Sequence, residues 1–233
     1  MKQPNTVELL GYYGSDEIIA CSAWTSTSRN LTEEKKARYP KLINDLWMNG
    51  HETPFEKGTV HFLVNTDIAT HIHLLKHRIS SLNSESGRYK ELKDDKFYIP
   101  DDWDNIPASF ISDAFGTTID LHGENWSSIL EEYSKFGNEL YHKCVEQIAP
   151  SLGRKRAKES ARYFKAYNMQ YEADVMFNMR SFSNFQKLRN SEHAQKEIRE
   201  VANLMLECVE QIADKPFQHT LEIFKTRLQT KGY

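Results

Sequence analysis

The chain lacks the features that mark secreted disulfide-rich proteins and membrane proteins. Its three cysteines, Cys21, Cys144 and Cys208, are odd in number and form no Cys-x-x-Cys pair, so neither a disulfide framework nor a thiolate zinc site is indicated. No apolar run approaches the roughly 18 residues that span a bilayer. Residues 1–5 also lack an apolar signal core, so a cytoplasmic location and no membrane partner are expected.

An excess of positive charge is also missing. Lys and Arg number 30 against 33 Asp and Glu, and the net charge is −3. Proteins built for general nucleic-acid binding carry excess positive charge, so no nucleic-acid partner is expected and any basic site must be local. No Gly-x-Gly-x-x-Gly run follows a strand-like segment, which argues against a Rossmann pocket.

The remaining composition is that of a globular protein. Of the 233 residues, 39% are hydrophobic and 27% are charged, which suits a chain with one sizeable core. We therefore expect a single domain over residues 1–233.

Hydrophobic spacing predicts a mixture of strands and helices. Apolar and alternating runs predict strands over residues 7–10, 17–23 and 59–64. Apolar residues at three- and four-residue steps predict helices over residues 33–49, 68–78, 126–150, 194–212 and 220–228. Thr32 is the expected cap of the first helix and Pro40 is expected to break it. The Asp- and Pro-containing segment 93–107 is typical of a surface loop.

A polar stretch runs from Lys76 to Tyr89. It opens with Lys76-His77-Arg78, and after a spacer it offers small hydroxyl donors, the flexible backbone of Gly87 and the guanidinium of Arg88. Such groups bind phosphate or carboxylate, so the stretch is interpreted as an anion cradle. The plain alternative, a solvated loop or helix face, applies to many such stretches.

A second polar block covers residues 178–195. It holds Asn178, Arg180, Asn184, Arg189 and His193 within sixteen residues. Helical spacing would place several of these side chains on one side, although a polar helix surface would look the same.

Histidine spacing raises the possibility of a metal ion. His73 and His77 stand at i, i+4, but the sequence has no His-Glu-x-x-His arrangement and offers no convergent third ligand. No metal site is therefore predicted.

Both polar blocks resemble flavin-dependent thymidylate synthases. The signature of that family is Arg-His-Arg, seven residues, Ser and then Gly-Arg-Tyr. This chain has Lys76-His77-Arg78, residues 79–85, Ser86 and Gly87-Arg88-Tyr89. Residues 51–56 and the run 180–195 are similar to further family segments, and the resemblance extends over roughly residues 22–195.

The resemblance implies an α/β (α+β) fold with a mixed central sheet flanked by long helices, in a homotetramer that holds the flavin between subunits. It implies methylation of dUMP to dTMP, with methylenetetrahydrofolate as one-carbon donor, FAD as hydride carrier and NADPH as reductant. None of the three cysteines has a recognisable nucleophile setting, which fits a route that uses no enzyme cysteine.

The resemblance also implies the site residues. The expected FAD contacts are Ser26, Thr53, Glu56, Lys76, His77, Arg78, Asn178, Arg180, Asn184, Leu188 and His193. The expected nucleotide contacts are His73, Lys76, Ser84, Glu85, Ser86, Gly87, Arg88, Arg162 and Arg189. Arg189 is the expected catalytic residue, which polarises the uracil ring. Ser86 could be imagined as a nucleophile, but no base is placed beside it by sequence, so a phosphate-binding role is favoured.

Several positions depart from the family pattern. Lys76 replaces an arginine, His73 stands where a glutamine is usual, Ser84-Glu85 shifts a carboxylate by one residue, and Trp24 occupies a usual arginine position. These changes leave the identity of the pyrimidine substrate undecided. The alternative is a diverged relative that methylates or hydroxymethylates UMP or dCMP, and an alternative of another class is a non-enzymatic nucleotide- or RNA-binding module.

Overall fold

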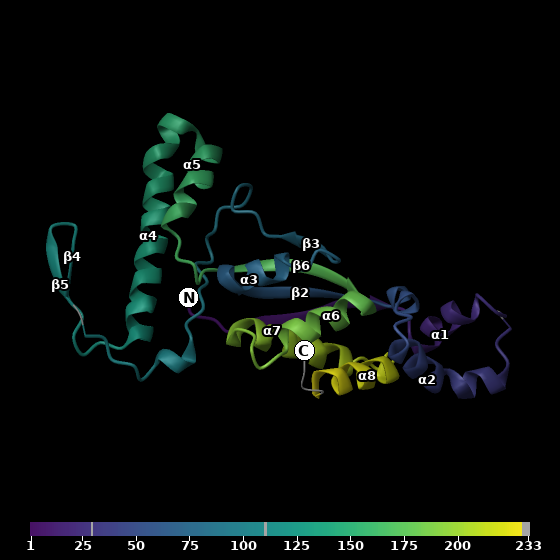
Figure 1. Cartoon of the computed structure of the whole chain (residues 1–233). Coiled ribbons are helices and arrows are strands. Elements are labelled where there is room, and N and C mark those ends of the chain that lie inside the picture. Colours follow the sequence, from purple (N-terminus) through teal and green to yellow (C-terminus); the bar gives the residue numbers. More distant parts are fainter. Residues whose placement is uncertain (29, 110, 230–233) are drawn as a thin grey trace. The chain divides into compact units, whose positions relative to one another are not determined.

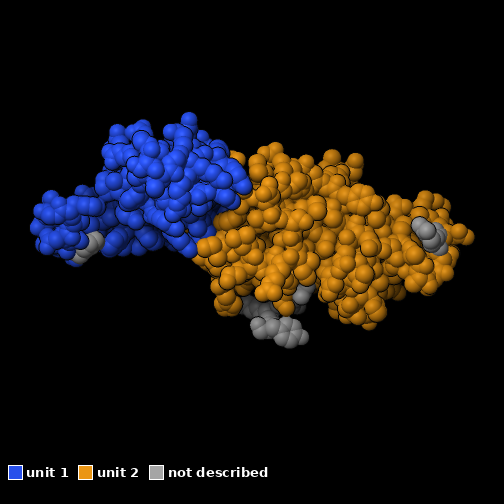
Figure 2. Space-filling view, turned by 90° about the horizontal axis from the view of Figure 1, so that it is seen from above, with its two compact units in different colours: residues 1–4, 66–69, 85–171 blue, residues 5–65, 70–84, 172–233 orange. Residues whose placement is uncertain are grey.

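The computed structural model describes residues 1–28, 30–109 and 111–229. The chain forms two compact units, shown in two colours in Figure 2. Unit 1 comprises residues 1–4, 66–69 and 85–171, and unit 2 comprises residues 5–65, 70–84 and 172–233. The expectation of a single domain stays a prediction. Across the part of the chain that the structure describes, no helix has the length and apolar character needed to cross a membrane.

Unit 2 is built on a four-stranded sheet (Figure 1). The strands are β1 (Thr6–Tyr13), β2 (Thr59–Asp67), β6 (Gln170–Asn178) and β3 (Ser81–Ser84), in the order β1-β2-β6-β3. β1 runs antiparallel to β2, and β3 runs antiparallel to β6 with Ser84 opposite Ala173. Val60, Phe62 and Val64 alternate along β2 and are fully buried, which confirms the strand predicted from their period of two.

Helices complete the core of unit 2. They are α1 (Asp16–Trp24), α2 (Glu33–Met48), the 3-10 turn η1 (Thr53–Lys57), α6 (Met179–Arg189), α7 (Lys196–Glu210) and α8 (Gln218–Gln229), while α3 (Ile68–Leu75) starts at the boundary between the units. Helix α7 lies along β1 of the sheet. Phe177, Phe182 and Phe185 are buried in one cluster with Val201 and Met205 of α7. The predicted α/β (α+β) class is therefore confirmed.

The strand predicted over residues 17–23 is wrong, because this segment is α1. Ser15 caps the helix by accepting a hydrogen bond from the Ile18 backbone N–H at 3.2 Å, and Asp16 and Glu17 occupy the first turn. Both features stabilise a helix N-terminus. A short apolar run does not distinguish a strand from a helix, and the cap decides between them here.

The break predicted at Pro40 is also wrong, since α2 continues through this residue. Its predicted cap is confirmed: Thr32 accepts a hydrogen bond from the Lys35 backbone N–H at 3.3 Å. The helix predicted over residues 68–78 is too long, because α3 ends at Leu75 and the Lys-His-Arg triplet follows it. The helices predicted over residues 194–212 and 220–228 are confirmed as α7 and α8.

Unit 1 is built around two helices in sequence, α4 (Trp126–Leu152) and α5 (Arg154–Ala161), followed by the 3-10 turn η3 (Arg162–Phe164). A 3-10 turn η2 (Asp101–Trp103) and a hairpin of β4 (Ile111–Ala114) and β5 (Thr117–Asp120) precede them. Gly153 connects α4 to α5 at a φ of 79°, a conformation that glycine adopts without strain. The buried cluster consists of Leu92, Tyr141, Val145, Ala157, Ala161 and Met169.

The long helix predicted from residue 126 to near Pro150 is confirmed as α4, which ends at Leu152. One prediction in unit 1 needs correction. The segment 93–107 is not a surface loop throughout, because Phe97 and Ile99 are 1% and 3% exposed. Their apolar side chains draw part of this Asp-rich segment into the interior.

Candidate active site

One cavity of unit 2 gathers most of the predicted flavin contacts. It has a volume of about 510 Å³ and lies where the triplet after α3 meets α6 and η1. The predicted residues that line it are Glu56, Lys76, His77, Arg78, Arg180, Asn184, Leu188 and Arg189, joined by Glu52, Ile79 and Ser181. The two polar blocks, about a hundred residues apart in sequence, therefore meet at one site.

Arg180, on the first turn of α6, is held between two carboxylates. Its Nε donates to Glu52 at 3.0 Å and its Nη1 donates to Glu56 at 2.7 Å. The hydrogen bonds to Glu56 and Glu52 raise the pKa of Arg180. The guanidinium has five N–H donors, so these two contacts leave others for a ligand.

Arg189, at the end of α6, is held by an uncharged partner. Its Nε donates to His77 Nε2 at 2.9 Å. Burial, followed by the charges of Arg189 and then His73, lowers the pKa of His77 to about 4. At neutral pH the imidazole is therefore neutral, its Nε2 accepts, and its proton sits on Nδ1. Phe185 packs edge-on against the ring, with centroids 4.9 Å apart.

The start of α6 explains the position of Asn178. Its side-chain oxygen accepts from the Ser181 backbone N–H at 2.8 Å, and the Ser181 hydroxyl donates to the Asn178 carbonyl at 3.0 Å. Asn178 is thus the N-cap that fixes the first turn carrying Arg180. It is a predicted flavin contact that is absent from the lining of the 510 Å³ cavity as the described residues define it.

Three further predicted flavin contacts do not line this cavity within the described part of the chain: Ser26, Thr53 and His193. All three are exposed, and the Ser26 hydroxyl donates to the Ala23 carbonyl at 2.9 Å. Conversely, the prediction missed Glu52, Ile79 and Ser181. Glu52 stands beside Thr53 in the segment 51–56 that resembles the family, and this position was the signal available in the sequence.

The predicted nucleotide contacts divide between the units. His73, Lys76, Ser84 and Arg189 belong to unit 2, and Glu85, Ser86, Gly87, Arg88 and Arg162 belong to unit 1. In unit 2, His73 Nε2 lies 3.2 Å from the Gln195 side-chain oxygen.

In unit 1, a tight turn carries Ser86, Gly87 and Arg88. A Cβ atom added at Gly87 would lie 2.7 Å from Arg162 Cδ and 3.1 Å from Leu92 Cδ1. Only glycine therefore allows this close approach without a shift of its neighbours. The turn and Arg162, which are far apart in sequence, are in direct contact.

The charged side chains at this turn form ion pairs with side chains of opposite charge. Arg88 Nε donates to Glu159 of α5 at 2.6 Å, and Lys90 donates to Glu85. The hydrogen bond to Glu159 raises the pKa of Arg88. The Ser86 hydroxyl accepts from the Arg88 backbone N–H at 3.3 Å, which closes the turn.

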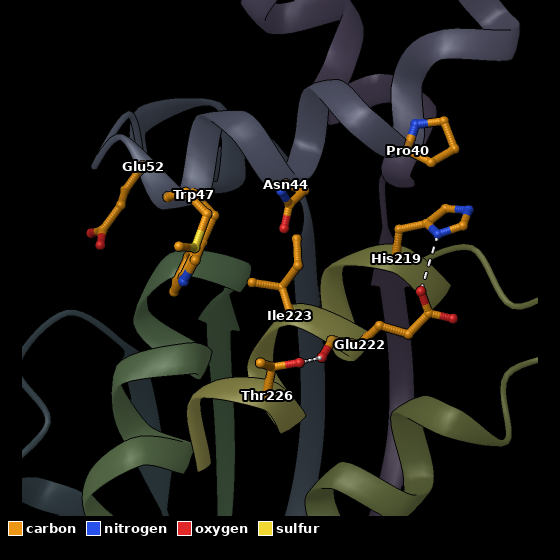
Figure 3. A pocket seen from close by; sticks show the side chains of 9 residues that line it. Pro40, Asn44, Trp47, Glu52, His219, Glu222, Ile223 and Thr226 are labelled. Carbon is orange, nitrogen blue, oxygen red and sulfur yellow. Dashed lines mark hydrogen bonds and ion pairs between the residues drawn. The ribbon is translucent and has the colours of Figure 1, made fainter. Parts of the chain in front are cut away.

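A second cavity of unit 2, about 530 Å³, lies between α2 and α8 (Figure 3). Figure 3 shows His219 beside Glu222, with its Nδ1 3.2 Å from Glu222 Oε2, and Trp47 on the other side of Ile223. Glu52 lines both this cavity and the 510 Å³ cavity. Among the residues that the structure describes, no cluster of three or more His, Cys, Asp or Glu side chains is suited to a metal ion.

The 510 Å³ cavity is chemically suited to an anion. Lys76, Arg78, Arg180 and Arg189 supply cations, and Glu52 and Glu56 are the carboxylates of its lining. The four cations outnumber the two carboxylates even though His77 is neutral. Guanidinium groups bind phosphate and carbonyl oxygens through directed hydrogen bonds.

Comparison of the sequence with known proteins identifies its family. A model of the family described as thymidylate synthase complementing protein matches residues 8–214. The flavin-dependent thymidylate synthase of Pseudothermotoga lettingae is 31% identical over 84% of this chain and 80% of its own. That of Thermotoga neapolitana is 33% identical over 84% of this chain and 81% of its own.

A solved structure is similar over almost the whole chain. It is the UMP/dUMP methylase PolB of Streptomyces cacaoi bound with 5-Br dUMP, with a TM-score of 0.74, 25% identity and coverage of 97% of this chain and 96% of that one. The chain therefore belongs to the flavin-dependent thymidylate synthase family of methyltransferase enzymes.

Proposed function

We propose that this enzyme methylates dUMP at carbon 5 to give dTMP, with methylenetetrahydrofolate as one-carbon donor, FAD as hydride carrier and NADPH as reductant. Family membership supports the reaction class. The observation that carries the proposal is Arg189, whose guanidinium is fixed by neutral His77 in the cation-rich cavity.

The reaction needs both a carbon transfer and a reduction. A methylene group leaves the folate and forms a bond to carbon 5 of the pyrimidine, and the hydrogen of that carbon leaves as a proton. A hydride then converts the methylene to a methyl group. When bound, FAD carries this hydride from NADPH, so the protein's own task is to bind, orient and polarise the reactants.

Arg189 is the proposed catalytic residue. Its positive charge would draw electron density toward a uracil carbonyl or stabilise the ring deprotonated at N3. Because His77 is neutral, it holds the guanidinium without cancelling its charge. Such preorganised electrostatic stabilisation is the main contribution that a side chain makes without covalent chemistry.

The residues of the 510 Å³ cavity suit an FAD molecule with its negative diphosphate. Lys76, Arg78 and Arg180 supply positive charge, and Asn184 supplies an exposed amide. His77, Glu56 and Leu188 complete this group of proposed contacts. Ser26, Thr53, Asn178 and His193, away from the cavity lining, are proposed as contacts by family resemblance.

We assign the nucleotide phosphate to the turn of Ser86, Gly87 and Arg88 with Arg162. The support is the direct contact between the turn and Arg162 and the lack of room for a Cβ at Gly87. His73, Lys76, Ser84 and Glu85 are proposed as further nucleotide contacts by resemblance.

The second candidate function is methylation of UMP. PolB, which is described as a UMP/dUMP methylase, is similar over almost the whole chain. His73 and Lys76 also depart from the usual family residues at proposed nucleotide positions. Assembly into a homotetramer with shared flavin, a single domain and a cytoplasmic location are further proposals from the family.

The test is a product analysis. Purified enzyme with FAD, methylenetetrahydrofolate and NADPH is incubated separately with dUMP, UMP and dCMP. The masses of the product nucleotides are then measured by mass spectrometry. We expect dTMP from dUMP. A methylated product from UMP alone would favour the second candidate, and a hydroxymethylated product would contradict the proposed reduction. Protein that is colourless and does not take up added FAD would favour a non-enzymatic binding module.

A further inference from the structure

Unit 1 contains a buried lysine for which the proposed chemistry has no use. Lys165 follows η3, and its side chain is 2% exposed. Its ammonium donates to Asp95 Oδ1, to Asn138 Oδ1 at 2.8 Å and to the Leu92 carbonyl at 3.4 Å. Three acceptors thus satisfy the three N–H donors of the group. The ring of Tyr141 lies 4.5 Å from Nζ.

Asp95 connects Lys165 to α4 and to the N-terminus through hydrogen bonds. Its carboxylate also lies 3.0 Å from His142 Nε2 on α4. Its backbone carbonyl accepts from the amino group of Met1 and from the Asn138 side chain. The pKa of Lys165 is lowered, because the effect of burial outweighs the hydrogen bond and charge of Asp95, which raise it. Removing Asp95 alone would leave the buried ammonium of Lys165 without its charged partner, which is costly.

The network holds the backbone of Leu92 from both sides. The Leu92 carbonyl accepts from Lys165, and the Leu92 N–H donates to the Tyr141 hydroxyl at 3.2 Å. The Leu92 side chain is one of the two groups that a Cβ at Gly87 would meet, at 3.1 Å. Lys165 therefore supports the Ser86–Arg88 turn through one intervening residue.

Direct contact of Lys165 with a substrate does not fit this site. The cavity beside it measures only about 20 Å³, roughly the space of one water molecule. All three N–H donors of Lys165 form hydrogen bonds within the protein. A structural link to the turn is the role that remains.

We propose that Lys165 is a positioning residue for nucleotide binding, acting through Leu92 on the Ser86–Arg88 turn. This inference rests on the proposed assignment of the phosphate to that turn. It concerns the affinity for the nucleotide and not the polarisation of its ring, because Arg189 lies in unit 2.

The test uses the paired variant Lys165→Met with Asp95→Asn, which removes both charges together. We expect the KM for dUMP to rise about tenfold, with kcat within about twofold of wild type, because a displaced turn weakens binding of the phosphate. FAD affinity should be unchanged. Lys143→Met, on an exposed position of α4, is the matched control and should leave both constants at wild-type values.

A double-mutant cycle tests the route through Leu92. Leu92→Ala should raise KM similarly, and its combination with the paired variant should add little, because residues that act through one contact are not additive. Fully additive effects would overturn the proposed route. If the paired variant unfolds, Tyr141→Phe removes only the hydroxyl that accepts from Leu92 and should raise KM by a smaller factor.

Direct binding of dUMP, and of UMP in parallel, measured by calorimetry separates this inference from the proposed function. Wild-type enzyme that binds either nucleotide but gives no methylated product would overturn the proposed function alone. Equal nucleotide affinity in wild type and in the folded paired variant would overturn the positioning role alone.

Discussion

Arg189 in the cavity of unit 2 and Arg88 in the turn of unit 1 are held in opposite ways. Arg189 is fixed by a neutral imidazole, whereas Arg88 is fixed by the carboxylate of Glu159. A neutral acceptor orients a guanidinium and leaves its charge available, while a carboxylate orients it and offsets much of its charge. The comparison indicates that Arg189 is prepared to stabilise charge on a ligand. Arg88 must exchange or share its partner to do so.

Replacing Arg189 should have the largest effect. We expect Arg189→Ala to lower kcat by about 10²-fold or more, since it removes a preorganised charge at the reacting ring. The visible flavin absorbance should persist, which shows that the cavity still forms. Arg38→Ala, an exposed arginine of α2, is the control, and unchanged turnover in Arg189→Ala would refute the assigned role.

Crowding the turn of unit 1 should have the next largest effect. Gly87→Ala places a methyl group 2.7 Å from Arg162 Cδ, so we expect the KM for dUMP to rise about tenfold while FAD affinity stays constant. Gly11→Ala is the matched control because a Cβ there meets nothing within 4 Å. An equal loss of FAD affinity would contradict the separation of the two regions.

The neutrality of His77 predicts a pH dependence of stability. Its pKa is about 4 in the folded protein and about 6.5 in an unfolded chain, so the unfolded state binds more protons between these values. The contribution of neutral His77 is thus complete above about pH 6.5 and falls as the pH drops toward 4. Arg189 and His73 are the charged and titratable groups that oppose its protonation.

Denaturant unfolding at several pH values measures this effect. His77→Gln keeps an acceptor for Arg189 but cannot titrate, so the free energy of unfolding should change less between pH 6.5 and 4 than in wild type. His51→Gln, an exposed histidine, is the control. Identical pH profiles for wild type and His77→Gln would contradict a neutral His77.

The smallest effect is expected from Glu52. Glu52→Gln removes one of the two carboxylates on Arg180, which frees positive charge for the flavin phosphates. Because exposed ion pairs are weak, we expect the Kd for FAD to fall by about two- to threefold in a fluorescence titration. Glu33→Gln, which loses an ion pair with Lys36 on α2, should leave it unchanged. Weaker FAD binding in Glu52→Gln would indicate that the carboxylate orients Arg180 for the ligand.

Secondary structure was predictable where long patterns dominated. The alternation along β2 and the helical spacing of α7 both gave correct elements, because a period maintained over many residues specifies one buried face. Prediction failed for α1, a short apolar run, and for Pro40, which the helix tolerates. Local capping and tertiary packing outweigh propensity in such segments.

The sequence by itself determined the family and the chemical character of the site. The spacing of Lys76-His77-Arg78 and Ser86 and the run after Asn178 were sufficient, because these residues carry the charged and hydrogen-bonding groups in a fixed order. Only the tertiary structure decided which groups face one another. Arg189 meets His77 across 112 positions of sequence, and burial beside that guanidinium makes the imidazole neutral. The support of Leu92 by Lys165 likewise exists only after folding, since burial and direction of a side chain are properties of the packed chain.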